Sequence, residues 1–206
     1  MKLPDPPLLV VTDRHQARLP LMKIVAAALD AGCRWISVRE KDLPANEQIE
    51  LTRTLRPQTC RVGACLTLHG NIPFSVSAAA TIDSIHLPDG ADASMARLWR
   101  GQGKLVGRSI HAIAEAADCG ELDYLMAGPA YDSASKPGYG PPLGPEGVGQ
   151  FARATSLPVV AIGGIGPGHV AALIKAGAAG IAVMGNVMRA TDPGGQVRAL
   201  IAALKT

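Results

Sequence analysis

The sequence contains few aromatic residues, little charge and no long hydrophobic run. Of its 206 residues, 3% are aromatic and 18% are charged, whereas 48% are hydrophobic and mostly small aliphatic residues. No apolar run reaches the roughly 18–20 residues that cross a bilayer, so we expect no membrane association. Prolines and charges within residues 4–14 also argue against a secretory signal, and we expect a cytoplasmic protein.

Basic and aromatic residues do not cluster as they do in nucleic-acid-binding proteins. The 20 basic and 17 acidic residues leave a formal net charge of +3, and the three Tyr and two Phe form no stacking series. We therefore expect no nucleic-acid partner, while locally clustered positive charge could bind an anionic small molecule.

The four cysteines follow neither a zinc-binding nor a redox pattern. They stand at positions 33, 60, 65 and 119, and none forms a Cys-x-x-Cys pair. We expect reduced thiols that pack as small hydrophobic side chains.

The sequence does have a regular alternation of short aliphatic runs with helical patterns. Predicted strands are Leu8–Thr12, Trp35–Arg39, Ala64–Leu68, Asp83–Leu87, Leu105–Ser109, Tyr124–Gly128, Pro158–Ile162 and Gly180–Met184. Predicted helices are 20–31, 45–56, 72–80, 92–100, 112–119, 145–154, 167–176 and 193–204. Eight such units predict a single-domain (β/α)8 TIM barrel over residues 1–206. An open doubly wound sheet is the alternative, and it would leave units unplaced.

The carboxyl ends of the barrel strands are where a functional site is expected. Ser37, Arg39 and Lys41 share one side of the second predicted strand and its end. Two cations at a barrel mouth suit a phosphate, diphosphate or carboxylate group. The alternative is a structural Arg39 that pairs with Glu40 or Asp42.

Histidines end the third and fourth predicted strands. His69 and His86 could serve proton transfer or metal binding. Carboxylates for a metal are scarce, because Asp89 and Asp92 alone lie close, and both also suit helix-cap or loop roles. We therefore assign no metal ligand and no certain cofactor, and Mg²⁺ stays open. Ser109, at the end of the fifth strand, could bind a phosphate or cap the following helix.

The loop after the sixth predicted strand is the longest in the chain. Its seventeen residues, 128–144, have no periodic pattern, which is typical of a mobile lid. Ser133, Ser135 and Lys136 in this loop can contact anionic oxygens. An idle insertion is the alternative.

Glycines follow the last two predicted strands. Gly163 and Gly164 end the seventh strand, and Met184 and Gly185 follow the eighth. Loops at these places of a TIM barrel frequently bind phosphate, and glycine lets the phosphate approach the backbone closely. We therefore predict a phosphate site here.

Several short motifs in order give the chain a family resemblance. They are Val11-Thr12-Asp13, Val38-Arg39-Glu40-Lys41, His86-Leu87, Gly107-Arg108-Ser109-Ile110-His111, Asp123-Tyr124, Gly128-Pro129, Ser135-Lys136 and Ala161-Ile162-Gly163-Gly164-Ile165. Over residues of about 8–190, the chain resembles the thiamine phosphate synthase superfamily, which includes the thiazole tautomerases. The resemblance implies a barrel that joins hydroxymethylpyrimidine diphosphate to a thiazole phosphate, with small phosphorylated molecules as partners. A homodimer is also compatible with small aliphatic helix faces.

The resemblance also implies roles for particular residues. Arg39 and Lys41 match a diphosphate-binding motif whose glutamine is replaced by Ser37. Ser109 and the segment 133–136 would contact the diphosphate, and the latter the thiazole as well. The Gly163-Gly164 pair and the Met184-Gly185 turn would hold the thiazole phosphate.

The departures from the family concern the metal. Synthases carry Asn-Asp after strand three, and the Asp ligates magnesium; this chain has His69-Gly70. The place of a second magnesium Asp falls on Ala91, with Asp92 one step off. Magnesium normally stabilises the charge on departing diphosphate, so these replacements separate the chain from ordinary synthases.

Two alternative functions therefore stay open. Tautomerases share the glycine at Gly70 and the Leu-Pro pair, but their catalytic histidine corresponds to Pro129 here. A metal-independent tautomerase-like enzyme would need His69 or His86 as a relocated proton-transfer group. The other alternative is a non-catalytic barrel that binds phosphorylated ligands without turnover.

Overall fold

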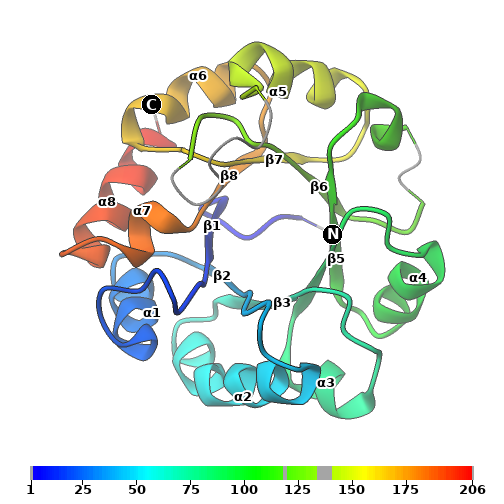
Figure 1. The fold of residues 1–206 in the computed structure, drawn as a ribbon, viewed down its shortest axis with the longest axis vertical. Helices are drawn as coiled ribbons and strands as arrows, with labels where there is room; N and C mark the ends of the chain where they lie inside the picture. Colours follow the sequence, from blue (N-terminus) through cyan, green and yellow to red (C-terminus); the bar gives the residue numbers. More distant parts are fainter. Residues whose placement is uncertain (1, 118–119, 134–140, 206) are drawn as a thin grey trace.

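The computed structural model describes residues 2–117, 120–133 and 141–205. Over these residues, eight parallel strands form a closed barrel in chain order, in which β1 pairs with both β2 and β8. Figure 1 looks along the barrel and shows the helices arranged in a ring around the strands. The predicted TIM barrel is confirmed.

The strands begin and end close to their predicted bounds. Each observed end lies within one residue of the prediction: β1 Leu8–Val11, β2 Trp35–Val38, β3 Cys65–His69, β4 Ser84–Leu87, β5 Leu105–Ile110, β6 Tyr124–Ala127, β7 Val159–Ile162 and β8 Gly180–Val183. The agreement arises because each run of aliphatic residues is buried on both faces of the sheet and is bounded by turn residues.

The helices depart from the prediction in four places: the end of the second helix, the start of the third, the fifth helix, and one short helix that was not predicted. They are α1 Leu21–Asp30, α2 Ala45–Arg61, α3 Val76–Thr81, α4 Ala93–Gly101, α5 Gly144–Arg153, α6 Pro167–Lys175, α7 Gly185–Met188 and α8 Pro193–Ala203. Helix α2 continues past Pro57, which is exposed, because Leu55 and Thr59 are buried on the other face. The short helix α7 was not predicted.

The helix predicted over residues 112–119 is wrong. Only a 3-10 turn, η1 (Ile113–Ala116), is present among the described residues of this segment. The Glu115 carboxylate turns back and accepts a hydrogen bond of 2.9 Å from the His111 backbone N–H. This contact joins His111, which precedes η1, to a side chain within η1. No helix of the described chain is long and apolar enough to cross a membrane.

Two hydrophobic clusters hold the barrel together. The larger cluster lies between the strands and the surrounding helices, and the smaller one fills the barrel interior around Trp35 and Tyr124. The Tyr124 ring crosses the interior because Gly107 opposite it has no side chain; a Cβ there would overlap the ring. Leu3 packs against the interior cluster. The filled interior forms a floor below the carboxyl-terminal end of the barrel.

Candidate active site

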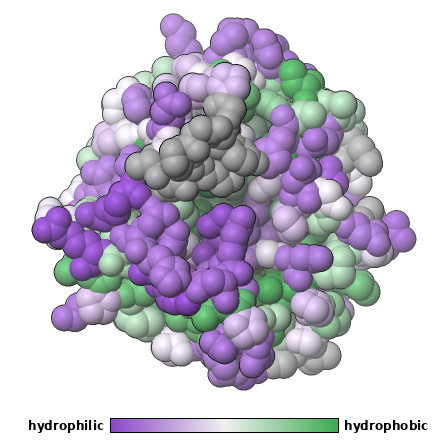
Figure 2. All heavy atoms as spheres, viewed as in Figure 1, coloured by the Kyte–Doolittle hydropathy of each residue, from purple (hydrophilic) through white to green (hydrophobic). Residues whose placement is uncertain are grey.

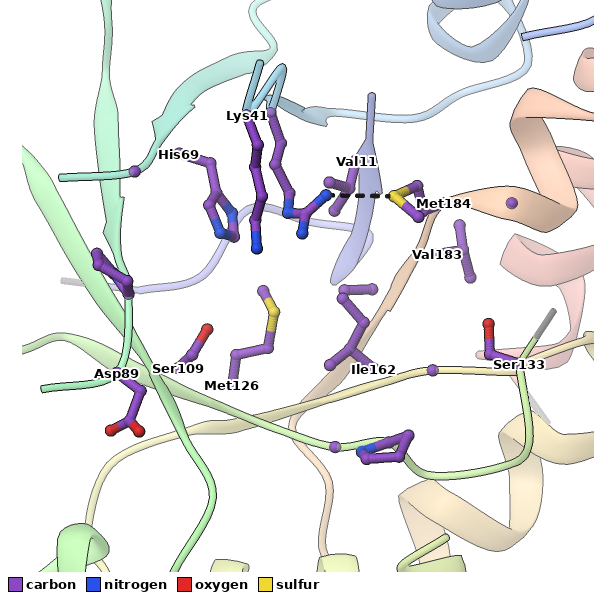
Figure 3. A pocket seen from close by; sticks show the side chains of 18 of the residues that line it. Val11, Lys41, His69, Asp89, Ser109, Met126, Ser133, Ile162, Val183 and Met184 are labelled. Carbon is purple, nitrogen blue, oxygen red and sulfur yellow. Dashed lines mark hydrogen bonds between the residues drawn. The ribbon is translucent and has the colours of Figure 1, made fainter. Parts of the chain in front are cut away.

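A cavity of about 930 Å³ opens at the carboxyl ends of the strands. Figure 2 shows hydrophilic side chains gathered around the middle of this face. Nine of the predicted site residues line it: Arg39, Lys41, His69, Ser109, Ser133, Gly163, Gly164, Met184 and Gly185. In Figure 3 several labelled side chains from different strands point toward one another across this space.

The remaining predicted site residues lie elsewhere or outside the described structure. Ser37 and His86 are fully buried and do not line the cavity. Ser37 is one inward step below Arg39 on β2, and its hydroxyl makes no hydrogen bond to a described residue. Ser135 and Lys136 lie outside the described residues.

The two carboxylates that follow Arg39 in the sequence, those of Glu40 and Asp42, pair with Arg14 and not with Arg39. Glu40 is 2% exposed and accepts hydrogen bonds from the Thr12 hydroxyl at 2.7 Å and from the Arg14 backbone N–H at 3.0 Å. Arg14 also forms ion pairs with Glu40 and Asp42. Both acidic neighbours of Arg39 are therefore engaged by Arg14, and the pairing proposed for a purely structural Arg39 is not formed.

The Arg39 guanidinium lies over the cavity without a carboxylate partner among the described residues. Its backbone N–H donates to the Thr12 hydroxyl at 3.0 Å, and its Nη1 approaches the Met184 sulfur at 3.8 Å, the dashed line in Figure 3. Burial lowers the pKa of Arg39, but the guanidinium remains charged because its ordinary pKa is so high. Lys41, which is exposed, reaches the same space. We call Arg39 and Lys41 the cationic edge.

The floor between the two sides of the cavity is apolar. It is formed by inward-facing residues of β1, β6, β7 and β8: Val11, Met126, Ile162 and Ala182. Figure 3 shows Met126 and Ile162 rising toward the cavity below the cationic edge. A surface of this kind suits the faces of flat heterocyclic rings.

Glycines border the cavity after β7 and β8, and the pair after β7 follows a strand that lies three strands from β2 around the barrel. We call Gly163, Gly164 and Gly185 the glycine cradle. Gly163 and Gly164 have φ of 104° and 64°, a region that other residues rarely adopt. A Cβ on Gly163 would lie 2.8 Å from the Pro129 Cα, and one on Gly164 would overlap the Asp132 carbonyl. The glycine pair is therefore required by the close approach of the loop after β6, in addition to any ligand.

Arg189 is a functional candidate that the sequence analysis missed. It lines the cavity together with Asn186, and its guanidinium covers Gly185, where a Cβ would overlap it. The guanidinium donates to the Gln16 side-chain oxygen, and the Gln16 amide donates to Asp13 at 2.5 Å. Asp13 also accepts from the His15 backbone N–H at 3.1 Å, so it anchors the loop after β1. No local pattern pointed to Arg189, because it follows a helix of only four residues.

A buried polar network lies beneath the cavity. His86 Nδ1 lies 3.0 Å from the Tyr124 hydroxyl, and His86 Nε2 lies 3.0 Å from the Ser109 hydroxyl. The His69 and His86 rings are 4.5 Å apart between centroids. Burial, with a smaller contribution from the Arg39 charge, lowers the pKa of His86 to about 3. His86 is therefore neutral at physiological pH, whereas His69 lies in the cavity lining.

The described residues do not fit a protein-held magnesium site. Residues 2–117, 120–133 and 141–205 bring together no group of three or more His, Cys, Asp or Glu side chains that could hold a metal. Asp89 and Asp132 are the carboxylates of the described cavity lining, and they follow the non-adjacent strands β4 and β6. Asp92 instead caps α4, accepting from the Ser94 N–H at 2.8 Å. The carboxylate oxygens that Mg²⁺ prefers as ligands therefore do not converge on one position. The charged side chains at the cavity mouth near β2 are the basic residues Arg39 and Lys41.

Comparison with known proteins identifies the family of the chain. A family model described as thiamine monophosphate synthase matches residues 8–187. A thiamine-phosphate synthase of Roseiflexus sp. is 36% identical over 200 residues, which cover 95% of this chain and 84% of the relative. That of Moorella thermoacetica is 34% identical over 194 residues, covering 93% and 91%. The resemblance stated from the motifs is confirmed.

Solved structures give the same result. The thiamine phosphate pyrophosphorylase of Pyrococcus furiosus superposes with a TM-score of 0.81 at 28% identity, covering 96% of this chain and 95% of that one. A 3-hexulose-6-phosphate synthase superposes with a TM-score of 0.71 at 17% identity, over 95% of this chain and 98% of its own, a likeness of fold alone.

Proposed function

The chain belongs to the thiamine monophosphate synthase family, and on that premise we propose that it joins a thiazole phosphate to hydroxymethylpyrimidine diphosphate. As an enzyme of thiamine biosynthesis it is a transferase of the thiamine-phosphate synthase type. The observation that carries the proposal is the division of one cavity into a cationic edge, an apolar floor and a glycine cradle.

The cationic edge is the proposed place of the diphosphate. Arg39 and Lys41 follow β2 into the cavity, and Ser109 and His69 extend the same polar side. A guanidinium offers several N–H donors to anionic oxygens, and its interaction is strengthened by partial burial. The carboxylates next to Arg39 are engaged by Arg14, so a diphosphate does not have to displace them.

The glycine cradle is the proposed place of the thiazole phosphate. The backbone of Gly163 and Gly164 borders the cavity without side chains, and Arg189 lies at the same side over Gly185. We include Arg189 as a phosphate ligand because a guanidinium supplies charge that backbone N–H groups lack. Asn186 and Ser133 add polar groups at this end of the cavity.

The size of the cavity supports two ligands in one space. A volume of about 930 Å³ is near the upper end of the range for a small-molecule site. With their anionic groups at opposite sides, the pyrimidine and thiazole rings would meet over Met126 and Ile162. Held proximity of two reactants replaces a bimolecular encounter and can lower the barrier substantially.

The proposed reaction requires the residues to bind and orient both ligands. The bond between the pyrimidine methylene carbon and the diphosphate oxygen breaks, and its electron pair leaves with the diphosphate. The thiazole nitrogen lone pair then forms the new carbon–nitrogen bond. Arg39, Lys41 and Ser109 stabilise the growing charge on the departing diphosphate. The apolar floor excludes water that would otherwise capture the pyrimidine carbon.

The direct test is formation of thiamine phosphate from the two substrates by the purified protein. We expect product in the wild-type protein and a loss of about tenfold or more in kcat/KM in Arg39→Gln, because one charged hydrogen-bonding group is removed. Arg53→Gln is the matched control, since Arg53 pairs with Glu50 on the exposed face of α2. Absence of product at high enzyme concentration would contradict the proposal.

A further inference from the structure

Tyr124, His86 and Ser109 form a hydrogen-bonded chain that leads from the barrel interior to the cavity. They come from β6, β4 and β5, and both contacts of the His86 ring measure 3.0 Å. Tyr124 and His86 are 0% exposed, whereas Ser109 is half-buried and lines the cavity. Ser109 is therefore the one member of this chain that a ligand can reach.

The Tyr124 ring is fixed in its place. On one side it fills the space left by Gly107, and on another its ring meets Trp35 edge-on, with 5.1 Å between centroids and an interplanar angle of 77°. Trp35 is itself anchored by a hydrogen bond of 2.9 Å from its ring N–H to the Thr67 hydroxyl. The Tyr124 hydroxyl therefore stays directed at His86.

The His86 ring can donate only one hydrogen bond. Its burial and the nearby Arg39 charge keep the imidazole neutral, with a pKa of about 3, and a neutral imidazole carries a single N–H. Burial also raises the pKa of the Tyr124 phenol, so this group keeps its proton. One His86 nitrogen must therefore accept while the other donates.

The tautomer of His86 decides what Ser109 offers to the cavity. If the Tyr124 O–H donates to Nδ1, the Nε2–H donates to Ser109, and the serine proton is left to donate into the cavity. In the reverse arrangement Ser109 donates to Nε2 and presents only lone pairs. An anionic ligand beside the cationic edge can accept a hydrogen bond from Ser109 but cannot donate one, so it favours the first arrangement.

We propose that Tyr124 and His86 are positioning residues that hold the Ser109 hydroxyl as a hydrogen-bond donor to the diphosphate group at the cationic edge. The inference rests on the proposed function for the location of the diphosphate. It assigns His86 a fixed, neutral role instead of proton transfer, and it gives Tyr124 a function although it never contacts the ligand.

A double-mutant cycle with inorganic diphosphate as the probe tests the inference. Tyr124→Phe keeps the ring that fills the space beside Gly107 and removes only the hydroxyl. We expect Tyr124→Phe and Ser109→Ala each to weaken diphosphate binding about fivefold to tenfold in calorimetry, as expected for one hydrogen bond to a charged group. The double variant is expected to bind no more weakly than Ser109→Ala, because Tyr124 acts through Ser109.

Binding of the thiazole phosphate is the internal control. Its affinity should be unchanged in both single variants, since general loosening of the barrel would weaken both ligands. Additive effects of the two substitutions, equal losses for both ligands, or absence of diphosphate binding by the wild-type protein would overturn the inference. A wild-type protein that shows the non-additive binding but forms no thiamine phosphate would support it while contradicting the proposed function.

Discussion

At the scale of single residues, charge at the cavity depends on which partners each arginine already has. Arg14 is held by Glu40 and Asp42, so it neutralises the acidic residues beside the mouth. This arrangement leaves Arg39 for a ligand. Arg189 lies over Gly185 of the glycine cradle and donates to the amide oxygen of Gln16.

Arg189 should therefore determine affinity for the phosphate of the thiazole. We expect Arg189→Gln to raise KM for the phosphorylated thiazole about tenfold or more, because a charge-assisted contact is lost. Arg189→Lys should retain part of the affinity, since it keeps the charge without the planar fork. Steady-state kinetics at saturating pyrimidine substrate measure both effects.

The same kinetics with a dephosphorylated thiazole provide the control. Arg189→Gln should not change KM for this analogue, whose binding does not use the phosphate. An equal rise in KM for both thiazoles would show that Arg189 supports the loop and not the ligand.

The buried histidine predicts how stability depends on pH. The pKa of His86 is about 3 in the folded protein, compared with 6.5 for an ordinary histidine. Between these values the unfolded state binds more protons, so His86 lowers the free energy of unfolding as pH falls below about 6.5. The slope should reach about 1.4 kcal/mol per pH unit.

Urea unfolding of the wild-type protein and His86→Gln between pH 7 and pH 4 measures this contribution. Carboxylates titrate in the same range, and the difference between the two proteins isolates the histidine. His69, Tyr124 and Arg39 surround the ring. Parallel stability curves for the two proteins would contradict the assignment of a neutral, buried His86.

At the scale of elements, most of the strands and the shared position of the strand-end residues could be predicted. A closed parallel barrel places the ends of β2, β3, β5, β7 and β8 around one opening, which is why Arg39, His69 and Ser109 meet there. Ser37 shares the inward side of β2 with Arg39, but the filled interior closes over it one step deeper. The alternation of side chains along a strand predicts which of them face the barrel interior. It does not predict whether an inward-facing side chain lies in the filled interior or reaches the cavity.

Other features depend on contacts that no local pattern reports. The network of His86 requires Tyr124 to cross the barrel above Gly107, which joins residues of three strands. Helix α7 has only four residues, too few for a periodic signal, and so Arg189 was missed. The turn η1 is set by the Glu115 side chain bonding back to the backbone, a contact outside the helical pattern.

The glycine of β5 is an element-scale requirement that mutation can test. Gly107→Ala should lower the free energy of unfolding by about 1–3 kcal/mol or more, because its Cβ would overlap the Tyr124 ring. Gly168→Ala is the matched control, since nothing lies within 4 Å of its Cβ and it is inside α6. We expect that control to be neutral or to stabilise by up to about 1 kcal/mol.

Chemical denaturation measures both glycine variants. Combining Gly107→Ala with Tyr124→Leu should recover part of the lost stability, because the smaller side chain vacates the overlapped space. Equal stability of Gly107→Ala and wild type would contradict the packing described for the barrel interior.

At the scale of the whole molecule, one barrel carries a cavity whose two sides differ in chemistry. Aliphatic residues build the strands and the surrounding helices, and two of the few aromatic residues, Trp35 and Tyr124, fill the interior. Three basic side chains, Arg39, Lys41 and Arg189, line the cavity at the carboxyl-terminal face. Among the described residues, the carboxylates that line the cavity, Asp89 and Asp132, follow different strands and do not converge on one metal position.

The ligand-free protein should not bind Mg²⁺ in a saturable manner. Calorimetric titration at millimolar Mg²⁺ should give only heats of dilution, because Asp89 and Asp132 follow non-adjacent strands and Asp92 caps α4. Asp89→Asn serves as the comparison and should give the same trace. A saturable heat that disappears in Asp89→Asn would contradict the absence of a magnesium site in the described residues.

The central claim is that one cavity holds two anionic groups at opposite sides, and a crystal structure with thiamine phosphate and diphosphate bound tests it most directly. The account predicts diphosphate density at Arg39, Lys41 and Ser109, and the phosphate of thiamine phosphate at Gly163, Gly164 and Gly185 with the Arg189 guanidinium in contact. Phosphate density away from the glycine cradle, or both anions on the same side, would contradict it.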